Sequence, residues 1–423
     1  MNVRTASTFL GVLSVFLYGY TMPGVTLNLF MGIFILLLAA TTLLLARGPL
    51  LIQKPVLVAL VVVFSVGAVG IMLGRGPISS YFVQAIGISF VTLCATVVVS
   101  GGGALSAKIF PTYLELSFVF AVVAIIELVL GVVGIYFEFL TPRIDYAFLN
   151  IHRISGLAME PSHYCIVMTP SVVAILVSAL LGRPCMSAGK SLLIIASYVL
   201  TFSSVGIFML SLILFAFLFR RSSISSVAAK SVLAIGVIGV FVVIPQINTR
   251  VMDTYNVFVS NEYANINLSS LTLYKNFLVS LNSAVDQPLF GAGLGGHEYN
   301  YFKYLPDSLT AQGINLNEKD ASSLLLRLVS EFGLPFTVAF YLITLFIWTG
   351  FPDRNDPSPI FWKKLTSTAI LGLIVVNSLR SGNYIIHGFP FFLVLYYSVY
   401  RSLKDGDIAL TALRTAAQIP KPL

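Results

Sequence analysis

The stretch RISGLAMEPSHYC, residues 153–165, places an arginine, a glutamate and a histidine directly before a long apolar run. Arginine keeps its charge and donates paired hydrogen bonds to phosphate oxygens, while a carboxylate or an imidazole can take a proton from a hydroxyl. Arg153, Glu160 and His163 could therefore serve a transfer reaction that releases a phosphate. Pro161 suits the first turn of a helix, which puts Glu160 at a helix N-terminus and favours its ionised form. That carboxylate could pair with an arginine or act as a base.

The elements that must position these groups are membrane spans. The chain has 423 residues, of which 57% are hydrophobic and 10% charged, and its mean hydropathy is +0.93. This composition predicts an all-α, polytopic membrane protein. The net charge of +8 is scattered between apolar runs, so it indicates topology determinants and not a nucleic-acid partner. Three widely spaced cysteines predict neither a metal site nor a disulfide framework.

Apolar stretches of bilayer length predict about 12 spans, and the first is a retained span because no small-residue cleavage site follows it. The long run from Lys190 to Arg221 is divided at Ser203–Ser204. The predicted spans are 6–22, 26–46, 55–73, 78–100, 110–136, 161–181, 190–204, 205–219, 231–247, 321–350, 365–380 and 386–402.

The charge distribution orients these spans. The short loops RGPLLIQK, GRPCMSAGK and RRSSISSVAAK are basic, and the positive-inside rule places them, with both termini, in the cytoplasm. Most acidic residues then fall outside. The chain divides into residues 1–247 with the first nine spans, a large outer loop at 248–320, and residues 321–423 with the last three spans and a cytoplasmic tail.

The outer loop is too long for an idle connection and is rich in tyrosine and asparagine, which favours order. Within it, SSLTLYKNFLVSLNSAVDQP predicts an amphipathic helix with Ser269 or Ser270 as N-cap and Pro288 after its end. Its apolar face would hold Leu273, Phe277, Leu281 and Val285, and the helix would lie on the membrane surface or cap the bundle. The glycine-rich stretch FGAGLGGHEYNY follows, without the preceding strand that a phosphate-binding loop needs.

Several arginines break the inside bias and fall on the outer side, in separate segments: Arg143, Arg153, Arg250, Arg327 and Arg380. Each alone could be a headgroup anchor, but together they favour an anion site, because charges at membrane depth usually face a cavity or a partner. Glu331 follows Arg327 by four residues, which predicts an ion pair on one helix face. Glu127, within the span 110–136, is either a proton-relay carboxylate or a hydrogen-bonded packing residue.

Four stretches in this order, RISGLAMEPSHY, QPLFGAGLGGHEY, LLLRLVSEFGLPF and LRSGNY, resemble the O-antigen polymerase (Wzy) family, which is related to the O-antigen ligases and exopolysaccharide polymerases. The resemblance covers roughly residues 140–400. It implies a metal-independent, GT-C-like glycosyltransferase without a cofactor, in the bacterial inner membrane, with a periplasmic active site. Its substrates would be undecaprenyl-pyrophosphate-linked glycans, as donor and as acceptor, and chain-length regulator and flippase proteins would be candidate partners.

Carried over by position, Arg153 matches the arginine of the family's R-x-x-G element and would contact the pyrophosphate. Glu160 and His163 stand where the polymerases carry E-P-S. Arg380 and Tyr384 match an R-x-G-x-Y ending. With no outer Asp-x-Asp motif to bind a metal, arginines would stabilise the leaving group.

The chain departs from the family pattern at two places. The ligases carry a His-Asn pair where this chain has Ser322 and Ser323, which favours a polymerase and leaves His297 as the base candidate, or as a capping residue of the glycine turn. Where relatives have an arginine in the outer helix, this chain has Lys275, so either Lys275 or Arg250 would take that role.

Two alternatives remain at this stage. A ligase would transfer finished polymer onto a lipid A core sugar. A flippase or transporter would need functional charges near the bilayer midplane and internal repeats, of which the sequence offers only Glu127 and no repeat.

Overall fold

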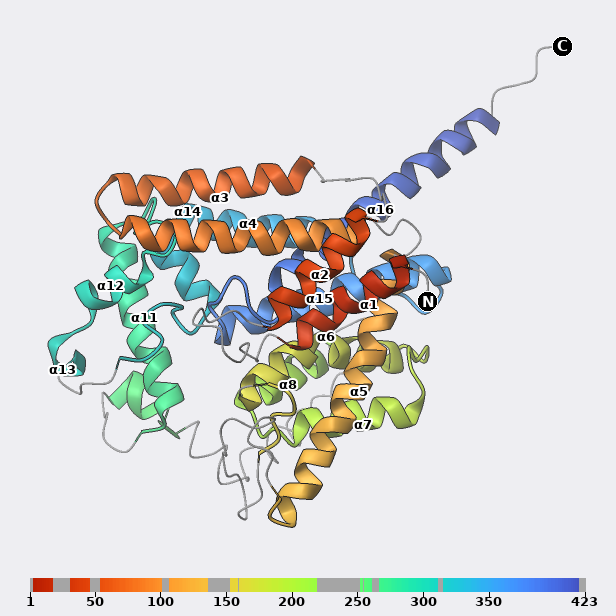
Figure 1. Cartoon of the computed structure of the whole chain (residues 1–423), viewed down its shortest axis with the longest axis horizontal. Helices are drawn as coiled ribbons and strands as arrows, with labels where there is room; N and C mark the ends of the chain where they lie inside the picture. The colour runs from red at the N-terminus through yellow and green to blue at the C-terminus, as the bar shows by residue number, and fades with distance from the viewer. Residues whose placement is uncertain are drawn as a thin grey trace.

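The apolar runs of the sequence fold into helices in the structure, a computed structural model that describes residues 3–17, 31–45, 54–100, 106–135, 153–158, 160–218, 252–253, 255–260, 266–310 and 315–417. No strand occurs among these residues. The helices are α1 (Val3–Phe16), α2 (Met31–Leu45), α3 (Lys54–Met72), α4 (Ile78–Ser100), α5 (Ser106–Val132), α6 (Pro161–Leu180), α7 (Ala188–Val199), α8 (Ser204–Leu218), the π-helical turn η3 (Asn256–Ser260), α11 (Leu268–Asp286), α12 (His297–Tyr304), α13 (Asp307–Thr310), α14 (Leu324–Phe346), α15 (Ser358–Arg380) and α16 (Phe389–Ala417) (Figure 1).

Six of these helices, α3, α4, α5, α6, α14 and α15, are long and apolar enough to cross a membrane, which indicates a membrane-embedded protein. Four shorter apolar helices, α1, α2, α7 and α8, fall on predicted spans. The last predicted span overlaps the start of α16, and the span 231–247 lies outside the described residues. The count of about 12 spans stays a prediction.

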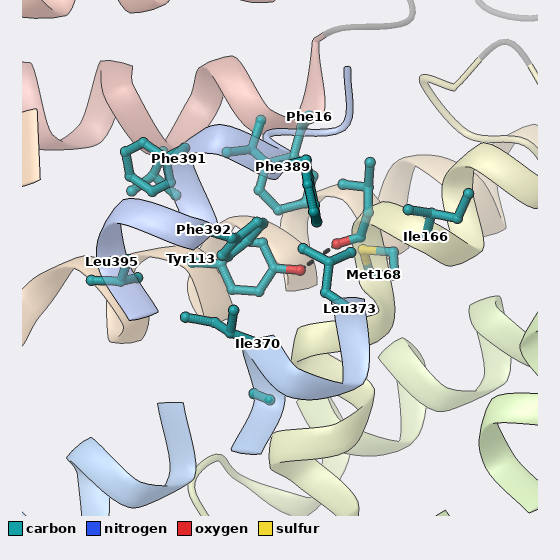
Figure 2. Packing of buried hydrophobic residues seen from close by; sticks show 14 of the residues in the cluster. Phe16, Tyr113, Ile166, Met168, Ile370, Leu373, Phe389, Phe391, Phe392 and Leu395 are labelled. Carbon is teal, nitrogen blue, oxygen red and sulfur yellow. Dashed lines mark hydrogen bonds between the residues drawn. The ribbon is translucent and has the colours of Figure 1, made fainter. Parts of the chain in front are cut away.

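The core of the bundle is built around Tyr113 of α5 (Figure 2). Its ring stacks on Phe16 of α1 at 5.3 Å and meets Phe392 of α16 edge-on at 5.2 Å. Its hydroxyl donates to the carbonyl of Val167 in α6. Ser117 and Ser171 form a second bond between α5 and α6 at 2.5 Å. Such polar contacts join helices where the surrounding lipid gives no hydrophobic driving force.

Contacts between helix ends sort them into two groups. At one end, here called the site end, α14 begins beside the last turn of α15, where Ser323 Oγ donates to the Ser378 carbonyl at 2.5 Å. At the opposite end, α6 finishes beside the start of α15, where Arg183 donates to the Asp356 carbonyl at 2.5 Å. The helix ends at each end of the bundle are those that the predicted spans, which alternate in direction across the membrane, place on the same side.

The predicted amphipathic helix is confirmed as α11, but its start is not where the sequence places it. Asn267 is the N-cap, and its side chain accepts from the Ser269 amide at 2.8 Å, so the prediction of Ser269 or Ser270 is wrong by two or three residues. An asparagine side chain reaches an N-terminal amide as well as a serine does, and the sequence offers both. In Figure 1, α11 runs across the direction of α3 and α4.

The segment around α11 has its own small apolar core. It consists of Val257, Leu271, Tyr274, Val279, Tyr301, Leu305 and Leu309. Several polar residues of α11, among them Lys275 and Asn276, are also buried, whereas Phe277, Leu281 and Val285 are exposed. The helix therefore turns its apolar face outward.

Candidate functional site

Arg327 and Glu331 form a buried ion pair one turn apart on α14, as the sequence predicts. Arg327 Nε lies 2.9 Å from Glu331 Oε1, and the two side chains are 1% and 0% exposed. Arg327 Nη1 donates to the Gly382 carbonyl at 2.9 Å, and its guanidinium lies over the Tyr384 ring at 4.1 Å. The Tyr384 hydroxyl donates to the other Glu331 oxygen at 3.0 Å. The two charges are thus paired and both carboxylate oxygens accept hydrogen bonds, which a buried pair requires.

One nitrogen of this cluster is still available. Arg327 Nη2 is buried and has no hydrogen-bond partner within the part of the chain that the structure describes. A buried guanidinium N–H without a partner is costly, so a water molecule or an anion is expected there.

A kink in α14 sets the position of Glu331. Gly333 has φ 77° and ψ 177°, a conformation that is essentially restricted to glycine. Pro335 has no N–H, so it leaves the Glu331 carbonyl without its helical partner. Gly293, in the glycine turn (residues 288–296), donates its amide to that carbonyl at 2.8 Å.

The glycine turn completes the hydrogen bonds on both sides of the kink. Ala292 donates its amide to the Ser330 carbonyl at 3.0 Å, and Leu334 donates to the Pro288 carbonyl at 2.8 Å. A Cβ atom on Gly333 would lie 2.6 Å from the Pro288 oxygen, so the close approach needs glycine. The motifs QPLFGAGLGG and SEFGLP are therefore two halves of one clasp that supports the Arg327–Glu331 pair.

His297, which begins α12, lies in a buried polar network. Its Nδ1 is 2.9 Å from Ser330 Oγ and its Nε2 is 2.8 Å from Asn276 Oδ1. Asn276 Nδ2 donates to the Thr272 carbonyl, which leaves Oδ1 as an acceptor for the imidazole. Asn300 Nδ2 donates to Ser330 Oγ, so the serine proton is directed at the ring. These partners select a neutral imidazole with its proton on Nε2.

The environment of His297 favours a positioning role. The side chain is fully buried. Burial, followed by the charge of Arg327, lowers the pKa of His297 from 6.5 to about 3. A general base needs a nitrogen open to the substrate hydroxyl, and both ring nitrogens here are occupied. The role of His297 as base stays a prediction that this geometry does not favour.

Lys275 points into the segment around α11 and not toward the bundle. Its side chain is fully buried, its Nζ donates to the Leu309 carbonyl at 3.0 Å, and burial lowers the pKa of Lys275. Lys275 therefore joins α11 to α13. The pyrophosphate role that the sequence offers it would require this contact to break.

Arg380, the last residue of α15, is only half-buried and joins several segments at the site end. Its Nη2 donates to Ser269 Oγ at 2.9 Å, at the start of α11. Glu160 and Asp320 are near enough to interact with it electrostatically, and Asp320 interacts with Arg327 in the same way. Arg380 and Glu160, two positions from the sequence prediction, thus interact electrostatically, and Asp320 interacts with both Arg380 and Arg327.

Asp320 belongs to a turn whose backbone lies in close contact with the chain that follows α15. A Cβ atom on Gly382 would lie 1.5 Å from the Asp320 carbonyl oxygen, so only glycine fits at that contact. The Asp320 side chain accepts from the Ser322 amide at 3.0 Å. Ser322 has φ 57° and its hydroxyl accepts from Asn276, which links this turn to the His297 network.

Arg153 lies on the α7–α8 turn. Its Nε donates to the Thr201 carbonyl at 3.1 Å, and the side chain is half-buried. The same RISG stretch is held by Glu127, which accepts from the Gly156 amide at 2.6 Å and from Ser155 Oγ at 3.4 Å. Glu127 stands five residues before the end of α5, and these bonds fit the packing role better than a proton relay.

Glu160 and His163 lie at the start of α6. Glu160 is the extended N-cap residue and accepts from Ser162 Oγ at 3.2 Å. The His163 ring lies 4.5 Å from that of His387, which is buried with φ 58°. The start of α6 therefore meets the chain between α15 and α16.

The structure thus brings Arg327, Glu331 and Tyr384 into one cluster, with His297 behind it, and places Glu160 within electrostatic range of Arg380. Arg143 and Arg250 lie outside the described residues. Among the described residues, no group of three or more His, Cys, Asp or Glu side chains is arranged to hold a metal ion.

Sequence reasoning missed five residues of the site: Asn276, Asn300, Asp320, Ser330 and His387. Asn276 stands on the polar side of the α11 pattern, which was the available signal for it. Ser330 directly precedes Glu331, and that neighbour was its only signal. His387 follows the LRSGNY stretch by three residues. Asn300 and Asp320 carry no pattern that marks them.

No protein-family model and no curated protein matches the chain. The function therefore has to be inferred from the residues and their arrangement.

Proposed function

We propose that the chain is a membrane-embedded glycosyltransferase that polymerises undecaprenyl-pyrophosphate-linked oligosaccharide repeat units into O-antigen or exopolysaccharide. The growing chain on one lipid pyrophosphate would be the donor, and a single lipid-linked repeat the acceptor. The reaction would use no metal, because arginine side chains supply the positive charge. The resemblance of four stretches of the sequence to the polymerases motivates the reaction class.

The observation that carries the proposal is the placement of Arg380. Its guanidinium is half-buried where α15 ends, α11 begins and α6 begins, with Glu160 and Asp320 nearby. A guanidinium that is fixed by two hydrogen bonds to Ser269 and still partly accessible can bind pyrophosphate with its remaining N–H groups. Arg153, also half-buried at the site end, would be the second such group.

In the proposed reaction, an acceptor hydroxyl oxygen attacks the anomeric carbon of the donor. The bond from that carbon to the pyrophosphate oxygen breaks, and the pyrophosphate leaves with the electron pair on its lipid. The hydroxyl proton passes to a carboxylate, for which Glu160 is the proposed base, because it is half-buried and interacts electrostatically with Arg380. Arg380 would stabilise the charge that develops on the leaving group.

Arg327 and Glu331 would act through position. Their mutual bonds, together with Tyr384 and Gly382, occupy most of the guanidinium, so Arg327 would offer the substrate only Nη2. The pair would hold the chain around Gly382 next to Arg380. His163 would lie at the same end as Glu160, without the task of a base.

The proposed site is at the periplasmic face of the bacterial inner membrane, with both termini in the cytoplasm. This orientation follows from the predicted spans and the positive-inside rule. Chain-length regulator and flippase proteins would be the partners of such an enzyme.

The test is reconstitution of the purified protein with a lipid-linked repeat unit, with the products separated by ladder electrophoresis. Arg380→Ala is expected to lower the polymerisation rate by about 100-fold or more, as loss of a transition-state donor does. Arg380→Lys should retain part of the rate, because it keeps the charge but loses the paired hydrogen bonds. Arg153→Ala should also lower it.

Lys319→Ala is the matched control, since Lys319 is an exposed cation in the turn that carries Asp320. Its rate should equal that of the parent. The proposal fails if the parent protein forms no polymer, or if Arg380→Ala and Arg153→Ala both polymerise at the parent rate. Product released from the pyrophosphate carrier onto a lipid A core sugar would instead identify a ligase.

A further inference from the structure

Two helices that are long enough to span a membrane bring Leu289 and Leu294 of the glycine turn below the site end of the bundle. A Cβ atom on Gly67 of α3 would lie 2.7 Å from Leu294, and one on Gly333 of α14 would lie 2.6 Å from Leu289. Gly67 is thirteen residues from Lys54, where α3 begins at the opposite end, and Gly333 is thirteen residues from Phe346, where α14 ends there. At about 1.5 Å per residue, both glycines are about 20 Å from the opposite end of the bundle. The hydrocarbon layer is about 30 Å thick, so both lie within it, nearer the site end.

The backbone of the turn is suited to this depth. Irregular backbone is tolerated there only where its polar groups are satisfied by protein. The amides of Ala292 and Gly293 donate to α14, that of Gly291 donates to the Gln287 carbonyl, and that of Gly296 donates to Gly293.

The side chains at this depth face outward and are apolar. Leu289 is 60% exposed and Phe290 is 38% exposed. They continue the exposed face of α11, in which Leu281 is 48% and Val285 79% exposed. Exposed apolar side chains next to two spanning helices match the surface that those helices themselves present to lipid, such as Val338 of α14.

The position of α11 gives a gradient of depth along this surface. Ser280, beside Leu281, donates to the Leu326 carbonyl at 3.0 Å, whereas Leu289 lies against Gly333. Leu326 is seven residues closer to the start of α14, on the site-end side of the kink at Gly333. Asp286, within the same stretch, is paired with Lys303 of α12 at 3.0 Å, so its charge is matched.

We propose that residues 281–293 form a re-entrant segment in the outer leaflet at the site end, with lipid acyl chains as the occupant of its apolar face. Leu289 and Phe290 contact the hydrocarbon, and Leu281 and Val285 lie nearer the headgroups. The loop that the sequence places wholly outside the membrane is thus partly immersed, directly behind the clasp that holds Glu331.

The test is spin labelling of single cysteines in lipid nanodiscs, with Cys185→Ser as background because Cys94 and Cys165 are buried. Collision rates with oxygen, which concentrates in hydrocarbon, and with a water-soluble nickel chelate give the depth of each label. Labels at L289C and F290C, like a label at V338C, should collide mainly with oxygen, and a label at L281C should be shallower than the label at L289C. A label at K319C provides the aqueous reference.

Labels at L289C and F290C that collide mainly with nickel, as at K319C, would overturn the proposal. Labels shielded from both reagents would also overturn it, because they would show that protein covers the patch. Size-exclusion profiles equal to that of the background protein control for folding. The measurement needs no glycan, so it is independent of the proposed reaction.

Discussion

Two arginines of the site end, Arg327 and Arg380, differ in what their guanidinium groups can still bind. Arg327 is enclosed by Glu331, Tyr384 and the Gly382 carbonyl, whereas Arg380 has one side-chain partner in Ser269 and is half-exposed. Sequence alone gives both the same prediction, because it shows a charge at membrane depth but not its partners. The distinction between a positioning arginine and a binding one comes from packing.

At the scale of single residues, His297 makes a testable prediction about pH. Its folded pKa of about 3 lies below the unfolded value of 6.5, so the unfolded state takes up the proton first as the pH falls. Its contribution to stability is therefore complete above pH 6.5 and is lost between pH 6.5 and 3, by about 1.4 kcal/mol per pH unit.

This prediction can be checked with His297→Gln, which cannot be protonated. The free energy of unfolding of the parent should fall more steeply between pH 6.5 and 5 than that of the variant, measured by denaturant titration in detergent. Other histidines titrate in both proteins, so only the difference in slope counts. Equal slopes would show that His297 is already charged, or exposed, in the folded state.

At the scale of elements, the sequence predicts which helices exist better than it predicts their caps and their packing partners. The spans at α3, α4 and α6 agree with the helices to within about two residues, because long apolar runs leave the chain few alternatives in lipid. The helix α11 is predicted with its apolar face but with the wrong cap. What faces that helix depends on α14, forty residues later, and no local pattern contains that information.

Only part of the candidate site could be predicted from the sequence. The Arg327–Glu331 pair follows from helical spacing alone, and the structure confirms it. The network that connects Asn276, His297 and Ser330 joins three elements, so only tertiary packing reveals it.

The clasp between the glycine turn and α14 makes a prediction about Gly333. Gly333→Ala should destabilise the protein by more than about 1–3 kcal/mol, the cost of the backbone conformation alone, because the new Cβ also meets the Pro288 oxygen at 2.6 Å. Gly189→Ala in α7 is the matched control, since its Cβ meets nothing within 4 Å and should be neutral or stabilising by about 0.5 kcal/mol.

Thermal unfolding in detergent distinguishes these variants. A Tm for Gly333→Ala equal to that of Gly189→Ala would mean that α14 is not kinked at Gly333. It would also remove the structural support proposed for Glu331.

At the scale of the whole molecule, the two ends of the bundle differ in the charged residues that they carry. The loops and the helix starts at the opposite end carry Arg183, Lys190, Arg354, Lys363 and Lys364. The site end holds the ion pair, His163, His297 and His387, and the segment around α11. Basic loops stay in the cytoplasm, so the site end should face the periplasm.

Cysteine labelling tests this orientation. In the Cys185→Ser background, K319C at the site end should react with a membrane-impermeant maleimide in intact cells. N355C, exposed in the loop at the opposite end, should react only after the inner membrane is disrupted. The reverse pattern would place the site end in the cytoplasm. Such a result would leave the helices and their contacts unchanged, but it would rule out polymerisation of lipid-linked repeats on the periplasmic face.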